Sequence, residues 1–221
     1  MTAGATLLLD LDGTLTDNFS GIARSIRHAL TAMGAEPPPE SALRSCVGPP
    51  LRQSFARLLA TDDTREIERA LAYYRGRYAE TGWRENVVYA GVAALLAEFA
   101  GAGTTLILCT SKPQPYAERI VAHFGLAPHF RAIYGADLAG TRDDKTKLVA
   151  HLLRCEGLDA AACTMIGDRE HDILAAHANG VSAVGVLWGY GSRVELMRAG
   201  AEAIVAAPEE LPPALALLAR G

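Results

Sequence analysis

Two carboxylates lie two positions apart where the first apolar run of the chain ends. Leu7–Leu9 are followed by Asp10 and then by Asp12. Because alternate residues of an extended chain point to the same side, both side chains are expected to leave the end of a buried strand in one direction. Asp12-Gly13 taken alone is typical of a turn, but a turn gives no reason for a carboxylate at Asp10. The pair is therefore a candidate for chemistry.

A second acidic group follows another apolar run late in the chain. Asp168 and Asp172 come shortly after Thr164–Ile166. Residues four apart lie on one face once a helix begins, and a helix N-terminus stabilises negative charge. Helix capping would explain Asp168 by itself. Taken with Asp10 and Asp12, these two carboxylates predict an oxygen-rich site suited to Mg²⁺, a hard cation.

A site that transfers a phosphoryl group also needs hydrogen-bond donors and positive charge. Thr110 and Ser111 follow a third apolar run and offer hydroxyls and backbone N–H groups, although Ser111 alone is typical of a helix N-cap. Lys145 starts a helical pattern, where the helix dipole disfavours a cation, and this misfit favours a functional role. A solvated surface position is the ordinary explanation for any single lysine. Lys112 and Lys147 therefore stay open as alternatives.

These candidates all follow short apolar runs that have the length of buried strands. Helical patterns separate most of the runs, and this alternation predicts a doubly wound parallel α/β sheet. In open sheets of this kind ligands bind at the carboxyl edge of the strands, where the candidates would meet. The expected strands are Thr6–Leu11, Thr104–Cys109, Ala132–Tyr134, Cys163–Ile166, Ala183–Leu187 and Ala203–Val205.

The interval 17–83 breaks this rhythm, because it contains several helical patterns and no convincing strand. We therefore expect an all-helical insert over residues 17–83, carried by an α/β core made of residues 1–16 and 84–221. An insert placed after the first strand is expected to act as a lid over the carboxyl edge of the sheet.

Composition limits the classes of partner. The 221 residues are 50% hydrophobic with a formal net charge of −4, and their basic residues are scattered, which disfavours nucleic acid and lipid surfaces and favours a small polar substrate. The absence of a signal-peptide core or a long apolar stretch, together with four cysteines that form no CxxC pair, predicts a soluble cytoplasmic protein with reduced thiols. Oligomeric state stays open.

The four clusters, in this order and each at a strand end, resemble the haloacid dehalogenase superfamily of phosphohydrolases. The likeness is to its phosphoglycolate-phosphatase-like branch with a helical cap, and it covers nearly the whole chain. Asp10–Leu15 resembles the first motif, Thr110–Pro113 the second, Lys145 the third, and Gly167-Asp168 with Asp172 the fourth. The resemblance implies a Rossmann-like core with an inserted helical cap.

The resemblance also implies a mechanism. Asp10 would attack phosphorus to give an aspartyl-phosphate, and Asp12 would protonate the leaving oxygen and then activate water. Thr110 and Lys145 would hold the phosphoryl oxygens. Members that dehalogenate lack the second aspartate of the first motif, so Asp12 favours phosphate over halide.

The implied cofactor is Mg²⁺. Its ligands would be Asp10, the main-chain carbonyl of Asp12, and Asp168, with Asp172 ordering its waters. Substrate binding would add four residues: Gly13, Thr14, Ser111 and Arg52. Relatives often carry Lys-Pro in the third motif, whereas this chain has Lys145-Thr146-Lys147, and Lys145 is preferred because it comes first.

Substrate choice is expected to lie with the insert. Gly48–Arg52 could form a loop that enters the site, where Arg52 or Arg75 would bind a substrate carboxylate or second phosphate, although exposed arginines on helices are ordinary. Gly185–Ser192 resembles members named phosphoglycolate phosphatases or 5′-nucleotidases, so the substrate is expected to be a small phosphorylated metabolite. The alternatives are a phosphomutase of the β-phosphoglucomutase type and a non-catalytic ligand-binding protein.

Overall fold

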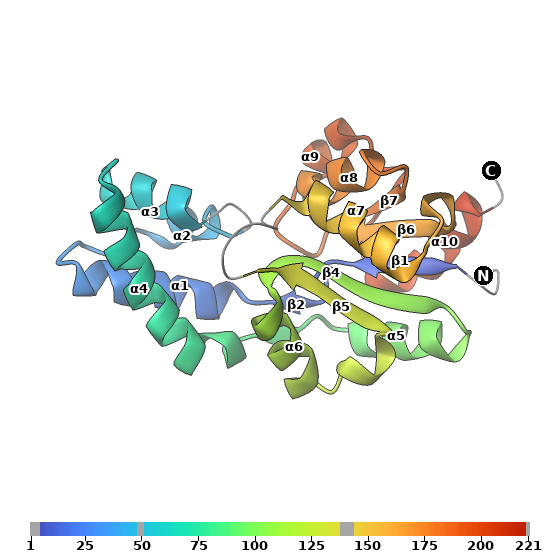
Figure 1. Ribbon diagram of the computed structural model, residues 1–221, viewed down its shortest axis with the longest axis horizontal. Coiled ribbons are helices and arrows are strands. Elements are labelled where there is room, and N and C mark those ends of the chain that lie inside the picture. Colours follow the sequence, from blue (N-terminus) through green and yellow to red (C-terminus); the bar gives the residue numbers. More distant parts are fainter. Residues whose placement is uncertain (1–4, 48–50, 138–143, 220–221) are drawn as a thin grey trace. The chain divides into compact units, whose positions relative to one another are not determined.

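The computed structural model describes residues 5–47, 51–137 and 144–219. The chain divides into two compact units. The α/β unit takes the described residues up to Thr16 and from Val88 onward, and the helical unit takes Asp17–Val87. Figure 1 shows a sheet flanked by helices in the first unit and a group of helices in the second.

Within the part of the α/β unit that the structure describes, six strands form a sheet in the order β5-β4-β1-β6-β7-β8, and all neighbouring pairs are parallel. β1 is central, because Leu9 pairs with Leu108 on one side and with Ile166 on the other. The expected α/β fold with its parallel sheet is confirmed. The strands are β1 (Thr6–Leu9), β4 (Thr105–Pro113), β5 (Ala132–Ala136), β6 (Cys163–Gly167), β7 (Ser182–Val186) and β8 (Ala203–Val205).

Helices cover both faces of this sheet, which explains why its strands are apolar without alternation. Leu8 packs with residues of α7, α8 and α9 in one core, while its neighbours Leu7 and Leu9, which point to the opposite face, are buried as well. In Figure 1, α7 and α8 lie on one side of the sheet and α5 and α6 on the other. The helices of the unit are α5 (Val92–Gly101), α6 (Gln114–His123), α7 (Lys145–Glu156), α8 (Glu170–His177), α9 (Arg193–Ala199) and α10 (Leu211–Leu218).

Two helix starts differ from the sequence expectation and matter for the site. β4 continues to Pro113, so α6 begins at Gln114 and Ser111 is not its N-cap. The strand outlasts its apolar run because Pro113 still pairs with Ala136 of β5. The helix α8 begins at Glu170, so Asp168 lies ahead of it, at the end of β6.

The described residues of the helical unit form four α-helices, and α1 packs along α4. The buried stripe of α1 includes Ile22, Ile26 and Leu30, and Tyr74 of α4 lies edge-on to Phe55 of α3. Burying each such large side chain contributes about 1.5–3 kcal/mol, so these stripes account for the unit's cohesion. The helices are α1 (Phe19–Ala32), α2 (Glu40–Arg44), α3 (Leu51–Leu59) and α4 (Thr64–Glu80), followed by a 3₁₀ turn, Gly82–Arg84.

The helical unit extends to Val87, beyond the expected boundary at residue 83. Glu85 explains the extension, because its carbonyl accepts a hydrogen bond from the Gly21 N–H (3.1 Å) and its carboxylate pairs with Arg24 (3.0 Å) and Arg77 (2.9 Å). The two crossings between the units, at Thr16–Asp17 (β2) and Val87–Val88 (β3), pair as a two-stranded ribbon. Among the described residues, no helix has the length and apolarity needed to cross a bilayer.

Candidate active site

The carboxyl ends of β1 and β6 bring the two acidic groups of the sequence together. The N–H of Asp10 donates to the carbonyl of Ile166 (3.0 Å), so the parallel pairing of these strands holds the backbone at Asp10. Asp168 follows the last residue of β6, and Asp172 lies in the first turn of α8. Parallel strands end at one edge of a sheet, which is why residues about 160 positions apart converge.

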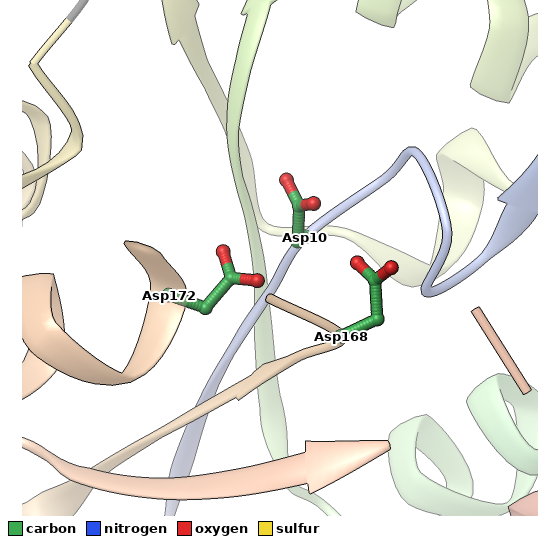
Figure 2. Close-up of side chains that lie close together, drawn as sticks. All are labelled: Asp10, Asp168 and Asp172. Carbon is green, nitrogen blue, oxygen red and sulfur yellow. The ribbon is translucent and has the colours of Figure 1, made fainter. Parts of the chain in front are cut away.

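Three carboxyl groups form a compact acidic cluster. Asp10, Asp168 and Asp172 each offer an oxygen, and these oxygens lie within 4.8 Å of one another. Figure 2 shows the three groups side by side, carried by the coil after β1, the end of β6 and α8. All three residues are buried, with at most 8% of their surface exposed. The cluster therefore concentrates negative charge where water is scarce.

The pKa values of two members show the cost of this concentration. Burial, reinforced by the charges of Asp172 and Asp10, raises the pKa of Asp168 to about 8. Burial also raises the pKa of Asp172, although the nearby Lys145 ammonium opposes the rise. Ionising Asp168 and Asp172 together is therefore unfavourable without further positive charge.

Lys145 supplies one positive charge. It is the first residue of α7, it is buried, and its Nζ pairs with Asp10 Oδ1 (2.8 Å) and with Asp172 Oδ1. Burial alone would lower the pKa of this ammonium, but the two carboxylates raise it above its ordinary value, so Lys145 stays charged. Lys147 is exposed on the same helix. The geometry thus singles out Lys145 as the lysine of the cluster.

A divalent cation fits this donor set. The three carboxylates and the one ammonium leave an excess of negative charge, and clustered oxygens at such separations are what a hard cation binds. A bound Mg²⁺ would also offset the burial and the neighbouring charges that raise the pKa of Asp168. The carboxylates of Asp10, Asp168 and Asp172 therefore lie where a metal could bind. Which of them contact the metal, and whether Asp172 orders its waters beside the Asp12 carbonyl, stays a prediction.

Asp12 lies outside this cluster and has a different partner. Its side chain is 22% exposed, and its Oδ2 accepts a hydrogen bond from Lys112 Nζ at 2.5 Å. The Lys112 side chain is 6% exposed. The second carboxylate of the first motif is thus held by an ammonium from β4.

A tight turn after Asp12 lets the first motif approach Asp168. Gly13 has a φ of 88°, and a Cβ on it would collide with the Asp168 carboxylate. The Thr14 hydroxyl donates a hydrogen bond to Asp168 Oδ1 (3.5 Å). Gly13 is therefore required by both its backbone conformation and its neighbour, while its predicted contact with substrate stays a prediction, as does that of Thr14.

The side chains of the second motif differ in burial. Thr110 and Lys112 are buried, whereas Ser111 between them is exposed, as expected for alternate residues of a strand. The Thr110 hydroxyl oxygen accepts a hydrogen bond from the backbone N–H of Lys112 (3.2 Å). The Ser111 side chain therefore leaves the strand on the side opposite Thr110 and Lys112.

A loop after β7 also packs on the first and fourth motifs. The indole N–H of Trp188 donates to the carbonyl of Thr14 (2.9 Å), and the N–H of Tyr190 donates to Asp168 Oδ2 (2.8 Å). Neither Trp188 nor Tyr190 was assigned a role from the sequence. The signal available was the repeated glycine in Trp188–Gly191, which indicates a close approach of backbone.

The cap residues proposed for specificity lie in the helical unit. Arg52 is exposed on α3 and pairs with Glu68 of α4. Arg75 is exposed on α4. Residues 48–50 of the predicted loop Gly48–Arg52 lie outside the described residues. The roles of Arg52 and Arg75 toward substrate stay predictions.

Comparison with known proteins assigns the family. The chain matches the model of the haloacid dehalogenase-like hydrolases over residues 7–186, which include all four motifs. The chain belongs to this family. The resemblance seen in the motifs is confirmed.

The relatives of this chain within the family are named as different enzymes. A 5′-nucleotidase from Pseudomonas aeruginosa is 47% identical over 190 residues, 86% of each protein. A phosphoglycolate phosphatase from Mesorhizobium japonicum is 31% identical over 191 residues, 85% of this chain and 84% of that one. The tyrosine-protein kinase PtkA from Mycobacterium tuberculosis is 40% identical over 185 residues, 84% of this chain, which spans 62% of that protein's length.

A solved structure of a predicted phosphatase from Clostridium acetobutylicum is 36% identical, with a TM-score of 0.89 and coverage of 97% of this chain and 99% of that one. The expected enzyme class is confirmed by these comparisons: this member of the haloacid dehalogenase-like hydrolases is a phosphatase.

Proposed function

We propose that this phosphatase hydrolyses a small phosphate monoester with the help of Mg²⁺, through a phosphoryl group carried transiently by Asp10. The observation that carries the proposal is the buried contact of Asp10 with Lys145 beside two further carboxylates. A nucleophilic carboxylate needs a fixed position and nearby positive charge, and the Lys145 ammonium lies 2.8 Å from Asp10 Oδ1.

The two chemical steps would use different residues of the first motif. Asp10 attacks phosphorus, and the P–O bond to the leaving group breaks as the bond to the Asp10 carboxylate forms. Asp12, on the other side of a single leucine, gives its proton to the leaving oxygen. In the second step Asp12 takes a proton from the water that attacks phosphorus, and the Asp10 carboxylate is regenerated with release of phosphate.

Positive charge and donors would hold the phosphoryl group during both steps. Lys145 is placed to balance charge on the oxygens next to Asp10. Thr110, buried at the same edge of the sheet, would donate through its hydroxyl. The chemistry that a bound Mg²⁺ would supply is neutralisation of the acidic cluster and of the phosphoryl oxygens. Asp10, Asp168 and the Asp12 carbonyl would hold it, and Asp172 would order its waters.

The substrate class follows from the relatives. Because the 5′-nucleotidase from Pseudomonas aeruginosa is 47% identical, a nucleoside 5′-monophosphate is the first candidate, and 2-phosphoglycolate is the second. The cytoplasm is the proposed compartment, where such metabolites occur and where the free thiols, three of them buried, would stay reduced.

The test is phosphate release from purified protein with and without Mg²⁺. The panel contains nucleoside 5′-monophosphates, 2-phosphoglycolate, sugar phosphates and p-nitrophenyl phosphate, and Asp10→Asn is the control. Release that requires Mg²⁺ and disappears in Asp10→Asn supports the proposal. Isomerisation of a sugar phosphate without release would establish a phosphomutase, and retained Mg²⁺ binding without any turnover would establish a binding protein.

A further inference from the structure

An ion pair beside the acidic cluster joins the first motif to the second. Lys112 Nζ lies 2.5 Å from Asp12 Oδ2, across 100 residues of sequence. The lysine side chain is 6% exposed and the aspartate side chain 22%. Burying an ammonium is unfavourable unless a well-placed partner offsets the loss of water. The pairing with Asp12 therefore helps to stabilise the buried Lys112 ammonium.

Three features of β4 and β5 fix the backbone from which the Lys112 side chain extends. The register between the two strands shifts between Thr110 and Pro113, which turns the stretch containing Lys112 out of the regular ladder. The Thr110 hydroxyl oxygen accepts the Lys112 backbone N–H at 3.2 Å. On β5, Gly135 lies so close that a Cβ there would be 2.7 Å from the Lys112 carbonyl oxygen. The backbone at Lys112 is thus fixed on both sides.

We propose that Lys112 is a positioning residue, which holds the carboxylate of Asp12 in the orientation needed for proton transfer. The inference rests on the proposed role of Asp12 as acid and base. Asp12 must donate a proton to the leaving oxygen in the first step and accept a proton from the attacking water in the second. A partly exposed carboxylate on a loop rotates unless it is held, and a misplacement of about 1 Å can cost about 10²-fold in rate. The Lys112 ammonium anchors one oxygen and so restricts that rotation.

Direct binding of the phosphoryl group by Lys112 is the competing role. If Lys112 binds the phosphoryl group, its removal should raise KM, and this effect should persist when Asp12 is also replaced. If Lys112 positions Asp12, its removal should lower kcat and leave KM nearly unchanged. This effect should disappear when Asp12 has no carboxylate to position. The two roles therefore separate in a double-mutant cycle.

The cycle compares wild type with Lys112→Met, Asp12→Asn and the double variant, on the best alkyl phosphate ester found in the substrate panel. We expect Lys112→Met to lower kcat about 10- to 100-fold with KM changed less than about threefold. In the Asp12→Asn background the same change should alter kcat less than about twofold, because the effects of groups acting as one unit do not add. Equal losses in both backgrounds, or a loss expressed in KM, would overturn the proposal.

A burst experiment adds a readout that a general loss of structure cannot produce. p-Nitrophenolate leaves without needing a proton, so Lys112→Met should form the phosphoenzyme quickly from p-nitrophenyl phosphate and hydrolyse it slowly. We expect a burst of p-nitrophenolate approaching one equivalent, followed by slow turnover. A uniform slowing of both phases would contradict the proposal.

The matched controls are Lys147→Met, which removes an exposed lysine from the same unit and should leave kcat unchanged, and Lys112→Arg, which keeps the positive charge and should recover part of the lost kcat. Lys112→Gln replaces Lys112→Met if thermal unfolding shows that the latter is not folded. Failure of the proposed function is recognised separately, because Asp10→Asn would then retain turnover whatever Lys112→Met does.

Discussion

The two units of the molecule use clustered charge in opposite ways. In the α/β unit, Asp168 lies buried among like charges, and its pKa is raised to about 8 by burial and by Asp172 and Asp10. In the helical unit, Glu85 faces Arg77 and Arg24, and its hydrogen bond to Arg77 lowers its pKa despite partial burial. The first cluster destabilises the metal-free fold, and the second stabilises its own unit.

The contrast locates unfavourable electrostatic energy in the acidic cluster of the α/β unit. A group of carboxylates that repel one another persists when something outside the chain, here a cation and a phosphoryl group, makes use of it. A carboxylate surrounded by arginines is already satisfied and needs no ligand. A substitution at Asp168 should therefore lower activity and raise the stability of the metal-free protein, whereas a substitution at Glu85 should lower stability.

The largest effect is expected for Asp168→Asn. Phosphatase activity with Mg²⁺ should fall at least about 10³-fold, because a proposed metal ligand is lost. The metal-free protein should become more stable by about 1–3 kcal/mol, since Asn removes the cost of keeping this buried acid protonated in the fold, and it can still accept the Tyr190 N–H. Thermal unfolding in EDTA, with the exposed Asp62→Asn as control for the charge change, measures the second effect. A lower melting temperature than wild type would show that the cluster is not under repulsion.

The pH dependence of this stability difference has a definite sign. An acid whose pKa is higher in the folded state than in the unfolded state destabilises the fold as pH rises between the two values. For Asp168 that window runs from its ordinary value, 3.8, to about 8. The advantage of Asp168→Asn in EDTA should therefore be small near pH 4 and grow toward pH 8.

A backbone change at Gly13 tests whether the acidic cluster depends on the turn that approaches it. Gly13→Ala adds strain at positive φ and a collision with Asp168, and should cost about 2–4 kcal/mol in unfolding free energy and about 10²-fold in kcat. Gly103→Ala is the matched control, because Gly103 has a φ of 78° with open space around it. It should cost about 1 kcal/mol and no activity. Equal costs at the two positions would mean that strain alone, and not the approach to Asp168, governs Gly13.

Adding and removing Mg²⁺ should shift stability through the same cluster. At a concentration about 100 times Kd, Mg²⁺ should stabilise the wild type by about 2.7 kcal/mol, which is several degrees in melting temperature for a chain of this size. Asp168→Asn should respond weakly, and EDTA should reverse the shift. Sodium chloride of matched ionic strength is the control for screening. An equal shift with sodium chloride would place the effect in general screening and not in the cluster.

The sequence predicted the sheet and the acidic groups well because both depend on local signals. Apolar runs that end in Asp10 and Asp168 mark strand ends, and parallel topology brings such ends together. The course of the chain past Cys109 was not predictable, because β4 continues through polar residues held by pairing with β5. The contact of Lys112 with Asp12 depends on that continuation. Long-range pairing of polar residues leaves no periodic signal in sequence.

The smallest effect is expected for Glu85→Gln in the helical unit. Loss of its pairing with Arg77 and Arg24 should cost about 1 kcal/mol at pH 7, allowing for solvent screening of a partly exposed group. Because the folded-state pKa of Glu85 is lowered, its stabilisation is complete above its ordinary value, 4.5, and is lost as pH falls through the lower folded value. The difference from wild type should therefore shrink below about pH 4.5, the reverse of the trend at Asp168. Unfolding by urea at pH 7 and pH 3.5, with exposed Glu80→Gln as control, measures it. A difference that grew on acidification would mean that Glu85 is strained by its neighbours, and the contrast between the two units would then fail.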